Sequence, residues 1–166
     1  MKKALVILTI LISACNTNND YLLRVEDTLT GKSGYINNKS DTIIPIGKYI
    51  YCFTDTFKNY AIVAKTNIGT VGIDREEKVL YKVFIFDNGP DYFSEGYFRI
   101  KNDKNKIGYA DTTGKIAIVP QFACAFPFKA GKAKVSNDCS TVSDGEHSSW
   151  TSNAWFYIDK RGKRVK

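Results

Sequence analysis

One cysteine in this sequence stands where covalent chemistry is expected: Cys15 follows a short apolar leader. Two lysines lie near the start, residues 4–12 (ALVILTILI) are apolar apart from one threonine, and Ser13 and Ala14 are small. A charged start, a short apolar run and small residues before a cleavage point are typical of a secretory signal. The run is shorter than the roughly 20 residues that a membrane-spanning helix needs. We therefore expect residues 1–14 to be a cleaved signal peptide, rather than a buried N-terminal strand or helix.

Residues 12–15 (ISAC) resemble the lipobox of bacterial lipoproteins. In that family the cysteine becomes the first residue of the mature chain and carries acyl groups. Each buried CH2 contributes roughly 0.8 kcal/mol, so two or more acyl chains hold a protein firmly on a membrane. The resemblance implies that Cys15 is the lipid attachment site, that residues 15–20 are a polar tether, and that membrane lipid anchors the exported protein to the cell envelope. In the alternative, Cys15 pairs in a disulfide.

The sequence offers few residues for catalysis or metal binding. The one histidine, His147, lies in a polar stretch, which removes most zinc sites, Cys-His pairs and Ser-His-Asp triads. Together with Cys139, Asp144 and Glu146 it could hold a metal weakly, although a solvated loop histidine is the simpler interpretation. Glycine-rich phosphate-binding motifs are absent. We predict no catalytic site, no metal and no cofactor.

Cys124 and Cys139 are predicted to form a disulfide. If residues 127–135 form a hairpin that turns near its centre, position 124 lies opposite about position 137, and Cys139 is one diagonal step away. An exported chain permits disulfides. Cys52 precedes its own turn by the same interval as Cys124, so it is expected to pack as a small apolar residue.

The chain repeats itself. One acidic or amide turn residue recurs at intervals of 37, 37 and 48, as Asn37, Asp74, Asp111 and Asp159. A second anchor lies between these positions, at Asn59, Gly96 and Gly131, where a left-handed backbone suits a hairpin turn. Fixed intervals of this length indicate a repeat architecture. Because the aspartates recur at one turn position, we interpret them as structural turn residues, with a carboxylate pair for glycoside hydrolysis as the alternative.

Short strands joined by tight turns fit each repeat. Alternation such as Phe98-Arg99-Ile100 sends one face inward and the other outward, and no window shows a helical apolar stripe. We predict an all-β fold over residues 21–166. It is expected to be an array of repeated β-hairpin units, about three full units plus a split one. The array is expected to be solenoid-like or a partly closed, barrel- or propeller-like structure whose two ends could pair.

The repeats resemble the WG-repeat family of bacterial proteins, whose unit looks like F-x-x-G-x-A-x-V followed by G-K-x-G-Y-I-D-x-x-G-K-x-V-I-P. The matching residues are Phe128, Gly131, Ala133 and Val135, then Gly108, Tyr109, Ala110, Asp111, Gly114, Lys115, Ile116 and Pro120. The tryptophan that names the family is kept only at Trp155. The resemblance implies a fold and a repeat surface, and it implies no single activity.

The longest interval points to an insertion at residues 137–149 (NDCSTVSDGEHSS), which is polar and lacks strand alternation. Surface loops on a rigid scaffold often carry function, so we expect this loop to contact a partner. The candidate binding residues are His147, Trp150 and Trp155, since aromatic rings could stack on sugars. The alternatives are a passive surface loop and aromatic side chains that fill the core.

The net charge is +7 and falls to +5 without Lys2 and Lys3, when 22 basic residues stand against 17 acidic ones. The charges are scattered, as solvated turns are, so we expect no nucleic-acid partner. We interpret residues 21–166 as a non-catalytic binding module for an unknown protein or glycan partner at the envelope. The alternatives are an envelope enzyme that acts on glycans through carboxylates, and a purely structural envelope protein.

Overall fold

The computed structural model of the chain describes residues 20–145 and 147–166. Every regular element in these residues is a β-strand, so the all-β prediction is confirmed. No helix of the described residues is long and apolar enough to cross a bilayer. The expected signal peptide, Cys15 and most of the tether lie outside the described residues, so what the sequence predicts of them stays a prediction.

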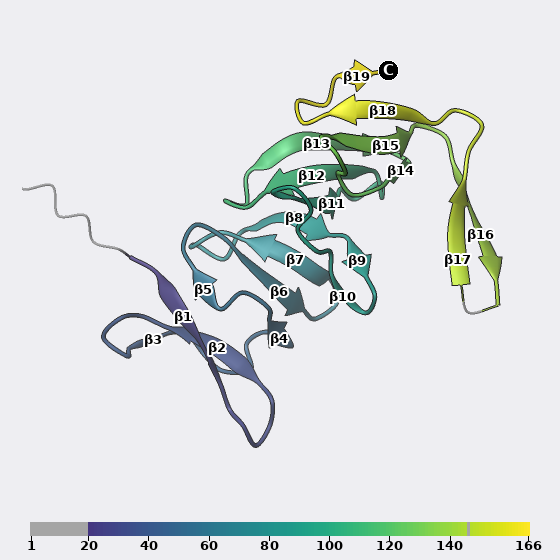
Figure 1. Cartoon of the computed structure of the whole chain (residues 1–166). Coiled ribbons are helices and arrows are strands. Elements are labelled where there is room, and N and C mark those ends of the chain that lie inside the picture. The colour runs from purple at the N-terminus through teal and green to yellow at the C-terminus, as the bar shows by residue number, and fades with distance from the viewer. Residues whose placement is uncertain (1–19, 146) are drawn as a thin grey trace, which may run out of the picture.

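The strands form three larger sheets and two separate hairpins, all antiparallel in the described residues (Figure 1). The first sheet has the order β3–β2–β1–β5, with β1 (Leu22–Glu26), β2 (Ser33–Ile36), β3 (Thr42–Ile44) and β5 (Thr56–Phe57). The central sheet has the order β13–β12–β11–β8–β7–β6–β4, with β4 (Tyr51–Cys52), β6 (Ala61–Lys65), β7 (Gly69–Ile73), β8 (Val79–Val83), β11 (Tyr97–Lys101), β12 (Ile107–Asp111) and β13 (Ile116–Phe122). The last sheet has the order β14–β15–β18–β19, with β14 (Cys124–Ala125), β15 (Lys132–Ser136), β18 (Phe156–Asp159) and β19 (Arg164–Val165). The hairpins are β9 (Ile85–Phe86) with β10 (Gly89–Pro90), and β16 (Ser140–Asp144) with β17 (His147–Thr151).

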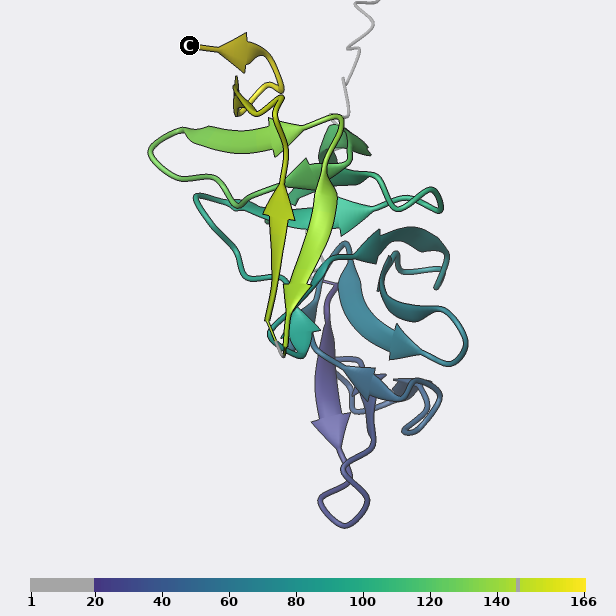
Figure 2. The ribbon, with the colours of Figure 1, turned by 90° about the vertical axis from the view of Figure 1, so that its right-hand side faces the viewer.

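The two ends of the described chain do not pair. Strand β1 pairs with β2 and β5, and β19 pairs with β18. Figures 1 and 2 both show β1 at one end of the molecule and the last sheet at the other. None of the sheets in the described residues closes on itself. A closed barrel is therefore absent from the described residues.

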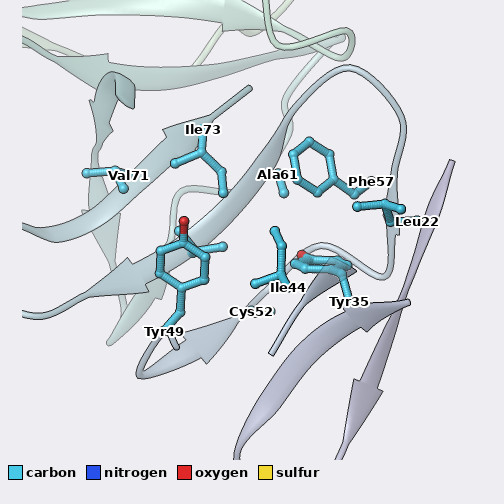
Figure 3. Close-up of a cluster of buried hydrophobic side chains, with 10 residues drawn as sticks. Leu22, Tyr35, Ile44, Tyr49, Cys52, Phe57, Ala61, Val71 and Ile73 are labelled. Atoms are coloured by element: carbon cyan, nitrogen blue, oxygen red, sulfur yellow. The ribbon is translucent and has the colours of Figure 1, made fainter. Parts of the chain in front are cut away.

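Three buried clusters lie between successive groups of strands. Figure 3 shows the first, in which side chains from β1 and β2 meet those of β6 and β7: Leu22, Tyr35, Ala61, Val63, Val71 and Ile73 are at most 1% exposed. The second cluster uses the opposite face of β6, where Ile62 alternates with Ala61 and Val63, and joins it to β11. The third joins β12 and β13 to β15 and β18. The central strands thus bury both faces, and this explains why their sequences are apolar at consecutive positions.

Five turns close with the same hydrogen bonds. In each, Oδ1 of the first residue accepts the backbone N–H groups two and four positions later, at 2.8–3.1 Å, with Asn37, Asp74, Asn102, Asp111 and Asp159 as first residues. The residue three positions later has a positive φ, as at Glu77 (62°) and Gly114 (81°). The sequence had marked four of these turns and missed Asn102.

The second predicted anchor is correct at only two of its three positions. Gly96 and Gly131 have φ values of 88° and 76°, and each follows another residue with positive φ, as type I′ hairpin turns require. Asn59 does not have a positive φ. It lies between β5 and β6, which belong to different sheets, so no tight hairpin is needed there.

Two glycines permit a close approach of neighbouring strands. A Cβ atom on Gly34 would lie 2.5 Å from the Ile44 carbonyl oxygen, and one on Gly108 would lie 2.5 Å from the Pro120 nitrogen. The tyrosine after each glycine is buried, and its hydroxyl donates to a backbone oxygen: Tyr35 to Thr54 at 2.8 Å and Tyr109 to Phe126 at 2.7 Å. The Gly-Tyr pair therefore fixes both the strand spacing and the following loop.

The shared turn predicts a contrast at Asp111. Replacing Asp111 by Ala removes the acceptor of two backbone N–H groups and should lower the free energy of unfolding by roughly 1–2 kcal/mol. Asp111→Asn keeps an oxygen acceptor, as Asn37 and Asn102 do, and should retain most of the stability at pH 7. Urea unfolding of the two variants measures the difference, and equal losses would contradict this role of the side chain.

The Asp111 turn should also give a pH dependence. The Thr113 hydroxyl, followed by the backbone N–H groups of Thr113 and Lys115, holds the pKa of Asp111 below its ordinary value. A lowered folded-state pKa contributes stability above the unfolded pKa, and this contribution is lost as the pH falls through the folded pKa. The advantage of the native chain over Asp111→Asn should therefore shrink below about pH 4.

Candidate binding surface

Four aromatic side chains form a continuous row, which we call the aromatic row: Phe84, Trp150, Phe126 and Trp155. Ring centroids are 5.8 Å apart for the first pair and 5.5 Å for each of the next two. Distances of 4.5–7 Å with tilted or edge-on rings are favourable for aromatic pairs. The four residues come from four separate segments, so the row exists only in the folded chain. Both tryptophans of the protein belong to it.

The outer face of the last sheet carries one end of the row. Ala125 and Val135 pair and point into the third cluster, so the next residues, Phe126 and Lys134, point outward. The Phe126 N–H donates to the Lys134 carbonyl at 2.9 Å, and Lys134 lies opposite Tyr157. These three side chains therefore stand side by side across β14, β15 and β18. Phe126 is 38% exposed and Tyr157 is 45% exposed.

A lysine lies over this end of the row. Nζ of Lys134 is 4.8 Å from the Trp155 ring centroid and 5.9 Å from that of Phe126. An ammonium within about 6 Å of an aromatic face is attracted by the ring quadrupole. The charge and the ring surfaces are thus presented to solvent at the same place.

A buried ion pair supports the other end of the row. Nε and Nη2 of Arg99 donate to the two carboxylate oxygens of Asp91 at 2.9 and 2.5 Å, and both side chains are at most 5% exposed. The Arg99 guanidinium also lies 4.0 Å from the Phe84 ring centroid and donates to the Ala125 carbonyl at 3.2 Å. Because a charge buried without its partner is costly, this pair fixes Phe84 next to the last sheet.

A groove of about 590 Å3 adjoins the outer face of the last sheet. It is lined by Ser94, Phe126, Pro127, Phe128, Lys129, Ala130, Lys132, Lys134 and Tyr157. Pro127 has no N–H, so strand pairing ends there and the chain opens into the turn before β15. The groove lies within the size range of about 300–1,000 Å3 for ligand sites. Its lining contains three lysines and no carboxylate.

The structure brings two of the three predicted binding residues together. Trp150 and Trp155 both pack against Phe126. His147 lies at the far end of β17, where its backbone pairs with Asp144, three pairs along from Trp150. The side chain of His147 lies outside the described ones. Sequence reasoning missed Phe84, Phe126 and Lys134, because each comes from a different repeat or strand and only the fold brings them together.

The insertion at residues 137–149, which the sequence predicted to be a loop, lies largely in a β-hairpin. Residues 140–151 form the β16–β17 hairpin, which projects from the body in Figure 1 and faces the viewer in Figure 2. Thr141, Val142 and Ser149 are exposed, and an arm of this kind needs no apolar alternation to pair its backbone. Trp150, at the base of the arm, packs against the third cluster.

Of the residues considered for metal binding, only Cys139 has a described side chain, since those of Asp144, Glu146 and His147 lie outside the described ones. Among the side chains that are described, no three His, Cys, Asp or Glu form a group that could hold a metal ion. The sulfur of Cys139 is bonded to Cys124. Asp74, Asp111 and Asp159 each direct an oxygen to the local backbone, as structural turn residues do.

The structure joins Cys124 and Cys139 in a disulfide, with a Cα–Cα distance of 6.2 Å. Cys124 lies opposite Ser136, one position from that expected. The bond ties the base of the inserted hairpin to β14. Cys52 is a buried free thiol in the first cluster, and burial raises its pKa. It packs as the small apolar residue that the sequence predicted.

The folded protein should carry this disulfide under oxidising conditions. Peptide mass mapping without reduction is expected to recover Cys124 bridged to Cys139, with Cys52 free. Reduction should lower the free energy of unfolding by about 3 kcal/mol, because the bond closes a loop with a sequence separation of 15. In a Cys139→Ser control, reduction should have no further effect. A bridged Cys52, or three free thiols, would refute the pairing.

Comparison with known proteins adds no relative. No protein-family model matches the chain, and no curated protein or solved structure matches it either.

Proposed function

We propose that the protein is a lipoprotein of the bacterial cell envelope whose folded part is a non-catalytic binding module. The leader at residues 1–14 and the cysteine after it support the anchor. The resemblance to the WG-repeat family supports a repeat scaffold, and such scaffolds offer extended binding surfaces. The binding surface in this proposal is the aromatic row together with the adjoining groove.

The proposed scaffold is an open, solenoid-like array of four units. The observations that support it are four antiparallel meanders, β1–β2–β3, β6–β7–β8, β11–β12–β13 and β15–β18–β19, whose first strands begin at residues 22, 61, 97 and 132. Each meander uses the shared turn between its second and third strands. The β16–β17 arm is an insertion between the first two strands of the last meander.

One observation carries the functional proposal: aromatic rings from four segments gather on a surface with an unneutralised lysine. Phe126 and Tyr157 remain substantially exposed although the third cluster lies directly behind them. Exposed aromatic side chains are enriched at sites of recognition. The buried Arg99–Asp91 pair and the turn aspartates already engage their carboxylates, which favours a binding module over a glycan-cleaving enzyme.

The anchor can be tested directly. In bacteria fed a fatty-acid probe, the native chain is expected to become labelled, and Cys15→Ser should lose the label because the acylated thiol is gone. Cys52→Ser is the matched control and should label like the native chain, since Cys52 is buried in the fold. Undiminished labelling of Cys15→Ser would refute the lipid anchor.

The binding surface can be tested with two exposed phenylalanines. Phe126→Ala should reduce recovery of partners in a cross-linking pull-down from native membranes at least fivefold, because Phe126 links both tryptophans. Phe53→Ala is the control, since Phe53 is 36% exposed and lies near the first sheet. Equal recovery of partners with both variants would show that the aromatic row is not the binding surface.

A third variant separates the row from the tip of the arm. Replacing residues 142–149 by a short Gly-Ser turn removes His147 and keeps Cys139 and Trp150. Loss of recovery in this variant alone would assign binding to the tip of the arm, where the sequence placed it, and would contradict the row.

A further inference from the structure

The outer face of the last sheet, which carries Phe126, Lys134 and Tyr157, is basic as well as aromatic. On this face Phe126 and Tyr157 are 38% and 45% exposed. Lys129, Lys132 and Lys134 line the groove. Lys132 donates to an oxygen of the last residue, Lys166, at 2.8 Å and is therefore engaged. Lys129 and Lys134 form no ion pair with a carboxylate of the described residues, so they give the groove a positive charge that complements an anionic ligand.

The rings on this face suit a ligand with flat apolar surfaces. Phe126 and Tyr157 stand on either side of Lys134, each substantially exposed. An aromatic face carries negative potential, so it attracts the weakly positive C–H groups on the flat side of a sugar ring. Neighbouring aromatic side chains on one sheet can engage successive rings of a chain of sugars.

The position of the Lys134 ammonium group favours one class of anionic ligand. Nζ of Lys134 lies over the Trp155 ring, so the cation and the stacking surface share one place. A carboxylate bonded directly to a sugar ring brings its charge and the ring to that place together. A phosphate ester holds its charge further from the ring on flexible bonds. The geometry thus favours a sugar acid.

We propose that the groove and the adjoining end of the aromatic row bind an acidic glycan, a polymer of uronic acids. Sugar rings stack on Phe126 and Tyr157, and the carboxylates pair with Lys129 and Lys134. This inference rests on the proposed function, since it names the ligand class of the same binding surface.

The position of the groove relative to the tether favours a polymer over the membrane surface as the ligand. Aromatic and basic side chains also suit an anionic lipid surface. However, Asp20 leads into β1, which lies at the opposite end of the molecule from the last sheet (Figures 1 and 2). If Cys15 anchors the chain, the tether joins the first sheet, whereas the groove lies on the last.

The test uses the full-length protein in detergent and two forms of one ligand. Fluorescent oligogalacturonate is the probe, and its methyl ester keeps the sugar rings and removes the charges. Binding is followed by fluorescence anisotropy. The acid should bind at least tenfold more tightly than the ester, and its affinity should fall as salt rises, because the ion pairs are exposed.

Two variants and two controls assign the site. Lys134→Gln and Tyr157→Ala should each weaken binding of the acid about tenfold. Lys58→Gln and Phe53→Ala change an exposed lysine and an exposed aromatic near the first sheet, and they should stay within twofold of the native chain. Thermal unfolding checks that each variant is folded. If a variant does not fold, the difference in affinity between the acid and the ester on the native chain still tests whether the protein recognises the carboxylates.

Several outcomes would overturn the glycan proposal. These are equal binding of acid and ester, equal weakening by the control variants, and equal affinity for an oligothymidylate or for vesicles with anionic lipid. Loss of partner recovery in Phe126→Ala together with no uronate binding would refute the acidic glycan alone. Uronate binding that survives Phe126→Ala, Lys134→Gln and Tyr157→Ala would refute the proposed surface as well.

Discussion

The structure depends on one side-chain interaction, the oxygen of an Asp or Asn that accepts two backbone N–H groups of its own turn. This bond holds the third following residue at positive φ, and the non-glycine residues Ser40, Glu77 and Asn105 adopt that conformation in three of the turns. The turn sets which residues of the flanking strands face each other. Since a shift of one residue would exchange the two faces of a strand, the turn also decides which side chains enter each cluster. The buried clusters are therefore a consequence of the turns as much as of hydrophobicity.

Burial on both faces distinguishes the central sheet from the last one. In the central sheet, β6 buries consecutive side chains on both of its faces, at Ala61, Ile62 and Val63. The last sheet buries only one face, with Val135 and Ile158, so its other face is free to vary without cost to the core. Terminal faces of repeat scaffolds are commonly polar. Here the outer face combines lysines with aromatic rings, and it is this combination that suggests recognition instead of solvation.

The sequence predicted the local chemistry better than the assembly. The turn role of Asp111 follows from its spacing, and the pairing of Cys124 with Cys139 follows from hairpin geometry within one unit. Phe84 and Phe126 could not be linked from the sequence, because their contact with Trp150 crosses three segments whose relative position the turns alone do not set. Asn102 was missed because its turn joins the other pair of strands in the unit, and Asn59 was overinterpreted because a gap between two sheets needs no tight turn. The β16–β17 arm escaped detection because strands exposed on both faces show no apolar alternation.

The buried ion pair shows how the binding surface and the scaffold are joined. Arg99 belongs to β11, a central strand whose neighbours Phe98 and Ile100 are in the second cluster, yet its guanidinium reaches Asp91, the Phe84 ring and the Ala125 carbonyl. One side chain thus connects the central sheet, the loop after the β9–β10 hairpin and the first strand of the last sheet. A hydrophobic residue of similar size would fill the space but would not fix the direction of these three elements. The directional hydrogen bonds of Arg99 therefore explain why the aromatic row keeps one geometry, and a fixed geometry lowers the entropic cost of binding a ligand.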